Sequence, residues 1–329
     1  MTSGLLADAR WIGRHGIGRF AAEVLRRLPV HRQIRNGPRP LSPFDPLWIE
    51  WQIFRLRPGL YFSPGFNPPS LCAVPLVFTI HDLLQIRMPE VSTPAKRAYY
   101  AAIVRPACRR AVRVLVVSEY SRAQVLEWTG LPDRRVVNVG NGVGPPFGPG
   151  GERYRPGHRY ILYAGNFRRH KNLDRLFAAF RDLRPPELRL LLTGDPDPSV
   201  LRSLRHFGVA GRTVFTGRVP DTGLAALYRG AELVVQPSLG EGFGLTALEA
   251  MACGAPVVAS RAGALPEVVG GAAQLVDPLD TGDLRRGIER VLSDGELRAA
   301  MARAGAERAR SFAWDSVASR VRAVLEEAA

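Results

Sequence analysis

Short apolar runs rich in β-branched residues alternate with stretches of helical periodicity over most of this chain. Short apolar strands separated by helices are typical of parallel sheets that are covered on both faces. This alternation therefore predicts an α/β protein. The predicted strands are residues 74–80, 112–117, 135–139, 160–164, 188–193, 213–216, 232–235 and 256–259, and the predicted helices are residues 94–110, 121–129, 173–183, 198–207, 222–229 and 298–328.

A dense cluster of Gly and Pro, GNGVGPPFGPGG, interrupts the alternation at residues 140–151. Such density marks a linker, and a chain of 329 residues is expected to form two domains. We predict two doubly wound, Rossmann-like domains that face each other across a cleft, with ligands at the carboxyl ends of the strands. The predicted domains are residues 1–147 and 148–312, and residues 313–329 form a C-terminal helix that packs back toward the first. Residues 29–70, rich in Pro and aromatic side chains, show no clear strand pattern.

The chain is strongly basic, with 45 Lys and Arg against 30 Asp and Glu and a formal net charge of +15. A basic surface attracts phosphates, nucleic acid or anionic lipid, but it does not determine the fold. Much of the charge is Arg in helical stretches, such as residues 283–290 and 301–310. Solvated helix faces and a membrane-facing basic surface both account for this pattern.

Cysteine usage and the absence of long apolar runs bear on the compartment. Cys72, Cys108 and Cys253 are odd in number and lack metal-ligand spacing, which favours reduced core residues. The N-terminus lacks the apolar core of a signal peptide, and no run approaches the ~20 apolar residues that span a bilayer. We expect a cytoplasmic protein whose membrane contact, if any, is peripheral and at the inner membrane face.

The sequence SLGEGFGLTALEAMACG, residues 238–254, places two carboxylates beside glycines and apolar residues. Glu241 lies in a turn that follows a predicted strand, and Glu249 lies just inside the helix that starts near Leu245. Glycines 240, 242 and 244 allow positive φ and close approach of the backbone to a ligand, and the helix start is suited to a phosphate. An exposed helix-end acid is the alternative for either glutamate, but apolar residues flank Glu249, and a buried acid needs a partner. We expect Glu241 to reach sugar hydroxyls and Glu249 a ribose diol.

A second candidate site is the basic turn GNFRRHKNL, residues 165–173, which also follows a predicted strand. Arg168, Arg169 and Lys171 would neutralise the charge that develops on a departing diphosphate. A solvated basic turn is the alternative explanation.

Two features of the first domain remain open from the residues alone. His81 ends the predicted strand 74–80, where a structural and a functional role are both conceivable. Gly16-Ile-Gly18 begins a match to the dinucleotide fingerprint GxGxxA. No acid stands about twenty residues further on, where the sequence is NGPRP, and this argues against a nicotinamide cofactor.

The block PSxGEGFGLxxLEAMAxGxPVVAS around Glu241 and Glu249 resembles the paired-glutamate motif of retaining glycosyltransferases of family 4. The resemblance is strong over residues 160–280, moderate over 74–142 and thin before residue 72. It implies the GT-B fold and a retaining transfer of a hexose from a nucleotide sugar to an acceptor hydroxyl. The implied acceptors are a glycan, a lipid-linked sugar or a small secondary metabolite.

The resemblance also implies roles for individual residues. Lys171 would hold the diphosphate, but Asn166 replaces the usual Arg, so Arg168 or Arg169 would take its place. Val219 would lie near the nucleobase, and Glu241 and His81 beside the donor sugar. The remaining donor-binding residues would be Gly16, Gly18, Gly242, Phe243, Gly244, Leu245, Thr246 and Glu249. No metal and no cofactor is expected, and GDP-mannose is the suggested donor.

Two other functions compete with glycosyl transfer. A nucleotide-sugar epimerase or hydrolase on the same scaffold would release a sugar without an acceptor. A non-enzymatic polyanion- or lipid-binding scaffold would bind with strong salt dependence and would not respond to nucleoside diphosphates.

Overall fold

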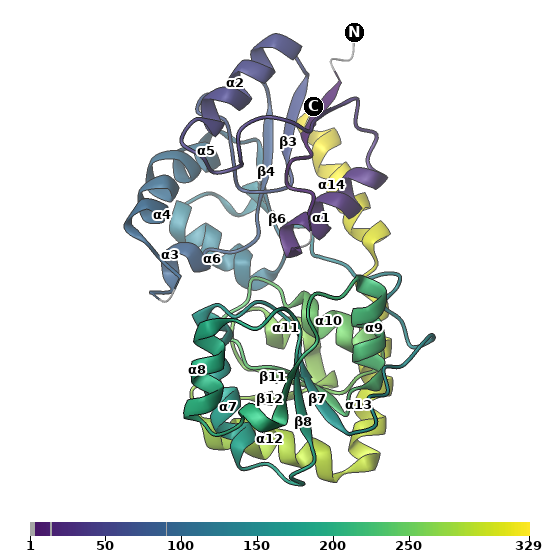
Figure 1. Ribbon diagram of the computed structural model, residues 1–329. Helices are drawn as coiled ribbons and strands as arrows, with labels where there is room; N and C mark the ends of the chain where they lie inside the picture. The colour runs from purple at the N-terminus through teal and green to yellow at the C-terminus, as the bar shows by residue number, and fades with distance from the viewer. Residues whose placement is uncertain (1–3, 14, 90) are drawn as a thin grey trace. The chain divides into compact units, whose positions relative to one another are not determined.

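The computed structural model describes residues 4–13, 15–89 and 91–329. The chain forms two compact units. Unit 1 comprises Met1–Gly142 together with Ala313–Ala329, and unit 2 comprises Val143–Phe312. In the described residues, each unit contains one six-stranded parallel sheet, and helices flank each sheet on both sides (Figure 1). This confirms the predicted α/β class.

The sheet of unit 1 has the strand order β2-β1-β3-β4-β5-β6. The chain therefore reverses its direction of travel between β1 and β3, which is a topological switch point. The strands are β1 (Leu5–Asp8), β2 (Arg32–Ile34), β3 (Leu60–Ser63), β4 (Leu76–Ile80), β5 (Arg113–Val116) and β6 (Val136–Asn138). The helices are α1 (Gly16–Arg27), α2 (Asp45–Leu56), α3 (Leu84–Arg87), α4 (Pro94–Tyr99), α5 (Arg105–Arg110), α6 (Glu119–Thr129) and α14 (Trp314–Ala328).

Residues 29–70 contain regular secondary structure, although the sequence showed no clear strand pattern there. They contain β2, α2 and β3. Helix α2 buries Ile49 and Ile53 but exposes Trp51 and Phe54 on its other side. Because apolar residues occupy both sides, the sequence lacks the polar face by which a surface helix is recognised. The predicted helix 94–110 is observed as two α-helices, α4 and α5, which a π-helical stretch at Tyr100–Val104 joins.

Helix α14 belongs to unit 1 although it ends the chain. It packs against α1, and the two helices lie side by side in Figure 1. Arg27 and Asp315 form an ion pair between them at 2.6 Å, and the rings of Phe20 and Trp314 are in contact. Unit 1 is therefore closed by residues 313–329, and its boundary with unit 2 falls at residue 142, earlier than the predicted 147.

A buried ionic cluster stabilises the carboxyl edge of the sheet in unit 1. The Arg10 guanidinium donates to Asp8, at the end of β1, and to Asp45, at the start of α2, with both N–O distances 2.6 Å. Asn67 donates to both carboxylates as well, at 2.9 and 3.1 Å. Burial raises the pKa of Asp45, although Arg10 opposes this rise. The cluster joins three segments that are distant in sequence, and the sequence alone did not indicate it.

The sheet of unit 2 has the strand order β12-β11-β10-β7-β8-β9. Its switch point lies between β7 and β10, which are neighbours in the sheet. The strands are β7 (Tyr160–Tyr163), β8 (Arg189–Leu192), β9 (Thr213–Phe215), β10 (Leu233–Gln236), β11 (Val257–Ser260) and β12 (Gln274–Val276). The helices are α7 (Leu173–Arg181), α8 (Pro198–His206), α9 (Asp221–Gly230), α10 (Leu245–Ala252), α11 (Leu265–Val269), α12 (Thr281–Ser293) and α13 (Gly295–Arg310).

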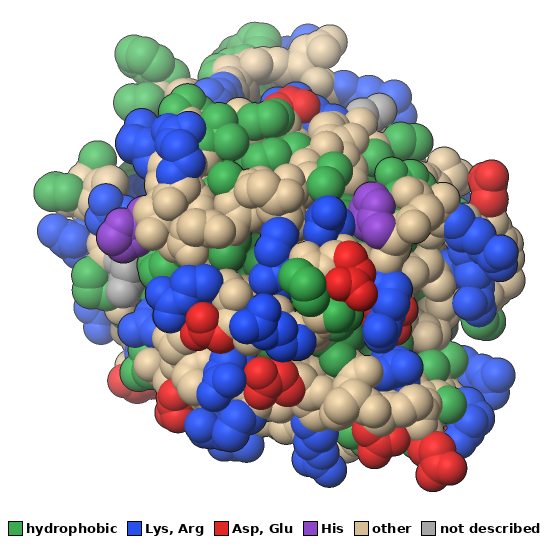
Figure 2. Space-filling model, turned by 60° about the horizontal axis from the view of Figure 1, so that its bottom comes forward, with side chains coloured by type: hydrophobic (Ala, Val, Ile, Leu, Met, Phe, Trp, Pro, Cys, Tyr) green, Lys and Arg blue, Asp and Glu red, His purple; other side chains and the backbone are tan. Residues whose placement is uncertain are grey.

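The basic residues are spread over the surface. On the face drawn in Figure 2, Lys and Arg side chains are numerous and acidic side chains lie among them. Such mixing is expected of solvated helix faces. Within the described ranges, no helix combines the length and apolar character that crossing a bilayer requires.

Candidate active site

The switch point of unit 2 brings together the two loops that the sequence singled out. One loop follows β7 and runs from residue 164 to Asn172, and the other follows β10 and runs from residue 237 to Gly244. Because β7 and β10 are parallel neighbours, their carboxyl ends lie at the same edge of the sheet. Ligands of doubly wound sheets bind at this position.

Lys171 and Glu241 form an ion pair at this edge, in which Glu241 is buried and Lys171 is half-buried. The Lys171 ammonium donates to the Glu241 carboxylate with an Nζ–Oε1 distance of 2.6 Å. The same carboxylate oxygen accepts from the Ser238 hydroxyl at 2.6 Å and from the Gln236 side-chain amide at 3.0 Å. The sequence predicted a role for Lys171 and Glu241 but assigned none to Gln236 or Ser238. The sequence features that could have indicated these two residues are their polar side chains, one at the end of β10 and one in the turn that follows.

These contacts keep Glu241 charged despite its burial. Burial by itself raises the pKa of the carboxyl group, but the Lys171 charge and the three hydrogen bonds outweigh it, and the net pKa lies below the ordinary value. An ionised Glu241 accepts hydrogen bonds and cannot act as a proton donor at neutral pH. The geometry therefore suits a group that holds a ligand hydroxyl or stabilises positive charge.

Asn172 fastens the two loops to each other. Its backbone lies in the left-handed region with φ 61°, and its side-chain amide donates to the carbonyls of Pro237 and Pro278 at 2.9 and 2.8 Å. The backbone N–H of Leu239 also donates to the carbonyl of His170 at 2.8 Å. Sequence reasoning gave Asn172 no role, although Asn is enriched at left-handed positions.

A third loop, which follows β11, covers the backbone of Glu241. The N–H of Ala264 donates to the Glu241 carbonyl at 3.0 Å. Gly263 has φ +62°, and a Cβ added there would lie 2.5 Å from the backbone nitrogen and oxygen of Glu241. This close approach explains why the position before Ala264 holds a glycine.

Helix α10 begins beside Lys171 and Glu241. Gly244 precedes it with φ +113°, a conformation that L side chains rarely adopt. The hydroxyl of Thr246 lies 3.4 Å from the carbonyl of Ala164, at the end of β7. Leu245 and Thr246 are half-buried, while Gly242 and Gly244 are buried. The first turn of α10 therefore lies at the edge where the two loops meet, and the first N–H groups of a helix have no partner within the helix.

Glu249 lies one turn further into α10 and is buried, as its apolar neighbours predicted. One carboxylate oxygen accepts from the Tyr228 hydroxyl at 3.2 Å. Tyr228 comes from α9 and was not identified from the sequence. Glu249 is thus a buried residue with a partner, and the exposed alternative is wrong.

The other predicted residues of unit 2 differ in exposure. Arg168 and Arg169 are exposed in the loop after β7, and Val219 is half-buried in the loop after β9. Phe243 is buried, and its ring packs edge-on against Phe312 at 5.8 Å. Its side chain therefore anchors the turn before α10.

His81 of unit 1 follows β4 and is 6% exposed. Its Nε2 lies 2.8 Å from the Pro64 carbonyl, so Nε2 carries the proton and Nδ1 is the acceptor. Burial lowers the pKa of His81 to about 4, against the opposing effect of the Pro64 hydrogen bond. The imidazole is therefore neutral at neutral pH.

Gly16 and Gly18 lie in the first turn of α1. The His15 imidazole caps this helix, because its Nδ1 accepts from the Gly18 N–H at 3.0 Å. A Cβ added at Gly18 would lie 2.3 Å from the carbonyl oxygen of Gly13. Gly18 thus allows the preceding loop to pack against the helix, and Gly16 is exposed.

The structure also bears on metal binding. Across residues 4–13, 15–89 and 91–329, no group of three or more His, Cys, Asp or Glu side chains is arranged to hold a metal ion. Metal-independent chemistry is still a prediction that requires a functional test.

Comparison with known proteins identifies relatives for both units. The chain matches the model for Glycosyl transferases group 1 over residues 152–308 and that for Glycosyltransferase Family 4 over residues 8–145. It is 29% identical over 356 residues to an O-antigen chain mannosyltransferase B of Escherichia coli, covering 92% of this chain and 93% of the relative. It is 30% identical over 306 residues to a D-inositol 3-phosphate glycosyltransferase of Corynebacterium efficiens, covering 85% of this chain and 72% of the relative. The solved structure of Anabaena HepE in complex with UDP-glucose matches with a TM-score of 0.79 at 19% identity, covering 98% of this chain and 99% of that one.

Proposed function

Because the chain is a glycosyltransferase that belongs to the group 1 enzymes of family 4 and has the GT-B fold, we propose that it transfers a hexose from a nucleoside diphosphate sugar. The proposed acceptor is a hydroxyl of a glycan, a lipid-linked sugar or a small secondary metabolite. The proposed transfer retains the anomeric configuration.

The observation that carries this proposal is the pairing of Lys171 with Glu241 beside the start of α10. A diphosphate beside the first turn of α10 would accept hydrogen bonds from the N–H groups around Phe243–Leu245 and benefit from the helix dipole. The Lys171 ammonium has three N–H donors, so it can contact the diphosphate while it still donates to Glu241. The exposed Arg168 or Arg169 would add a second cation.

The remaining roles follow from the same placement. Glu249, one turn into α10, is proposed to accept from the ribose diol, and Val219 to contact the nucleobase. Glu241 is proposed to hold hydroxyls of the donor sugar and to stabilise an oxocarbenium-like transition state. In unit 1, His81 is proposed to contact the donor sugar through a neutral imidazole, and Gly16 and Gly18 to approach the donor closely.

The proposed chemistry needs no metal and no cofactor. Lys171, one of the two arginines and the helix N-terminus would stabilise the departing diphosphate, and the acceptor would attack the face from which the diphosphate leaves. Exhaustive chelation should leave the rate unchanged. Loss of activity on chelation, restored by a divalent cation, would overturn the metal-free mechanism.

The donor is identified by a thermal-shift screen with UDP, GDP, dTDP and ADP, because a ligand that binds the folded state raises Tm. The relative named as a mannosyltransferase favours mannose and hence GDP-mannose. HepE was solved with UDP-glucose, so UDP-hexoses form the second set. A shift with none of the four diphosphates would contradict the proposed site.

Product analysis then separates transfer from the competing reactions. With a donor and an acceptor extract, a new glycoside should form, and its anomeric configuration should match that of the donor by NMR. Equal release of free sugar with and without acceptor would indicate a hydrolase, and a changed nucleotide sugar an epimerase.

A further inference from the structure

Helix α2 of unit 1 exposes a continuous apolar stripe. Leu47, Trp51 and Phe54 follow one another at the three- and four-residue spacing that places them on one side of a helix. They are 63%, 52% and 73% exposed, and Phe44, at the helix start, is 73% exposed. A helix that is apolar on both sides is normally buried on both sides. One side of α2 is therefore apolar and yet exposed to solvent.

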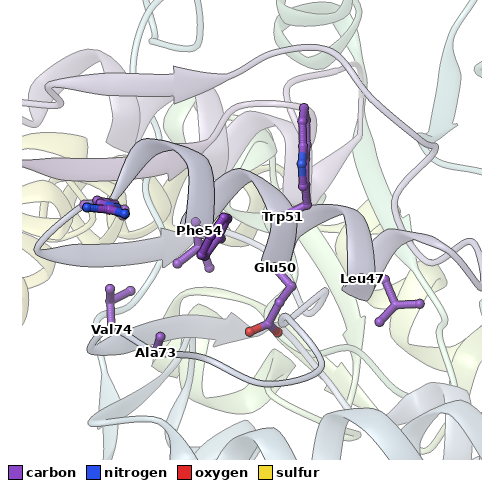
Figure 3. A pocket seen from close by; sticks show the side chains of 9 residues that line it. Leu47, Glu50, Trp51, Phe54, Ala73 and Val74 are labelled. Atoms are coloured by element: carbon purple, nitrogen blue, oxygen red, sulfur yellow. The ribbon is translucent and has the colours of Figure 1, made fainter.

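The stripe continues into the segment between β3 and β4. Leu71 in this segment is 67% exposed. Ala73 and Val74, together with Leu47, Trp51, Phe54 and the charged Glu50 and Arg57, line a cavity of about 470 Å³. Figure 3 shows these side chains projecting from α2 and from the segment before β4. The apolar area is thus a surface with a hollow in it.

Several basic side chains lie on or near α2. Residues 28–75 contain the arginines Arg32, Arg35, Arg39, Arg55 and Arg57, all exposed, and none of them forms an ion pair within the described part of the chain. Arg32 reaches the carbonyl of Leu56 at 3.4 Å, and the loop that carries Arg35 and Arg39 packs against α2 where Gly37 meets Trp48. These contacts place the five arginines around α2.

The two acids of this segment are less exposed than its arginines, since Asp45 is buried and Glu50 is half-buried. Asp45 is buried and paired with Arg10. Glu50 accepts from the backbone N–H of Leu71 at 2.6 Å and is directed toward the segment before β4 (Figure 3). The surface therefore presents apolar and aromatic side chains beside an excess of positive charge.

We propose that this α2 surface, composed of Phe44, Leu47, Trp51, Phe54, Leu71 and the five arginines, docks unit 1 on an anionic lipid bilayer. Trp and Phe side chains favour the membrane interface, and Arg side chains bind anionic headgroups while their stems rest on apolar surface. A second copy of this chain fits less well, because a symmetric contact would bring two sets of unpaired arginines together.

This docking does not depend on the proposed glycosyl transfer, so it is tested without donor or acceptor. The full-length protein is floated with vesicles of phosphatidylglycerol and phosphatidylcholine, and with vesicles of phosphatidylcholine alone. The expected affinity is at least tenfold higher for the anionic vesicles and falls in 1 M salt. Absence of binding to the anionic vesicles would overturn the proposal.

Trp51 reports on the depth of the contact. Brominated lipids in the anionic vesicles should quench part of the tryptophan emission. The Trp51→Phe variant should still bind but should lose that part of the quenching, because Trp51 is the exposed tryptophan of α2. Unchanged quenching in the variant would place the contact elsewhere and contradict the proposal.

Paired variants separate the apolar and basic contributions. Leu47→Ser with Phe54→Ser should weaken binding to anionic vesicles at least tenfold, and so should Arg55→Gln with Arg57→Asn, in which Asn suits the left-handed backbone of Arg57. The matched controls on unit 2 are the exposed Leu279→Ser, and Arg202→Gln with Arg205→Gln, which should bind like the parent.

The variants also distinguish a protein partner. Far-UV circular dichroism should be unchanged in all of them, because the substituted side chains are exposed. If both α2 pairs bound vesicles as the parent does, the proposal would fail. Concentration-dependent dimers that only the α2 variants lose, without vesicle binding by the parent, would assign the surface to self-association instead.

Discussion

The Lys171 ammonium lies 2.6 Å from the Glu241 carboxylate although the two residues are 70 positions apart in the sequence. The chain contains only two lysines, Lys96 and Lys171, among its 45 basic residues. Lys171 is thus a rare side chain in a strongly Arg-rich protein. A compact ammonium with three donors can serve a carboxylate and a phosphate together, whereas a planar guanidinium favours one bidentate partner.

Replacing Lys171 with Met should lower kcat by at least ~100-fold, the scale typical of losing one charge-stabilising donor. The substitution also leaves the buried Glu241 without its cation, so the pKa of that carboxyl should rise. Steady-state kinetics measure the effect, and Lys96→Met is the control, since the Lys96 ammonium donates to the backbone carbonyl of Val91 in unit 1. Near-normal turnover by the Lys171 variant would move the diphosphate site elsewhere.

Glu249→Gln should weaken nucleoside diphosphate binding about tenfold, because a hydrogen bond to a charged group contributes ~1.5–3 kcal/mol. Isothermal titration calorimetry measures the affinity. Tyr228→Phe is the companion variant, since it removes the Tyr228 hydroxyl that donates to Glu249 and keeps the carboxylate. We expect a smaller loss for Tyr228→Phe. Equal affinity for the Glu249 variant and the parent would exclude this residue from ribose recognition.

Gly263→Ala should displace Glu241 in the active site, in addition to straining the backbone at its positive φ. The new Cβ would meet the Glu241 backbone at 2.5 Å, so the turn that carries Glu241 must shift. Gly254→Ala is the matched control, because Gly254 has a similar positive φ of +74° but an added Cβ there would have no atom within 4 Å. We expect ~1 kcal/mol of destabilisation at Gly254, and a larger drop in both Tm and kcat at Gly263. Indistinguishable kinetics for the two variants would refute the steric coupling.

His81 should make unit 1 less stable in acid. Its folded-state pKa of about 4 lies below the unfolded value of 6.5, so the unfolded chain binds more protons between these values. Stability is then complete above about pH 6.5 and is lost as the pH falls toward 4. Between pH 7.5 and 4.5 this group should remove roughly 2–3 kcal/mol.

Urea unfolding followed by tryptophan fluorescence measures this loss, because all five tryptophans lie in unit 1. His81→Gln keeps an N–H donor for the Pro64 carbonyl but does not titrate. The variant should therefore lose roughly 2–3 kcal/mol less than the parent over the same pH interval. Parallel pH profiles for the two proteins would contradict a neutral, buried imidazole.

Arg10→Met should destabilise unit 1 by ~3–5 kcal/mol, because it leaves Asp8 and Asp45 buried without their cation. The same tryptophan-monitored unfolding measures the loss. Arg35→Met is the control on an exposed arginine of the same unit, and its effect should stay within ~0.5 kcal/mol. A loss below ~1 kcal/mol for Arg10→Met would mean that the cluster is not a stabilising contact.

Local pattern was sufficient for much of the fold and for the centre of the site. The strands around β4, β5 and β7 to β11 were predicted because each is a short apolar run between turn residues. Glu241, Glu249 and Lys171 were identified because they stand beside glycines or in a basic turn after predicted strands. Helix α2 was missed because its exposed side is as apolar as its buried side.

The sequence by itself determined the α/β class, the paired glutamates and the family resemblance, because all three depend on residues close together in the chain. Only the tertiary structure decided that Lys171 pairs with Glu241, that Asn172 ties their loops together and that Arg10 neutralises two buried acids. Those contacts depend on which parallel strands are neighbours and on the register between them. Periodicity within one segment carries no information about either.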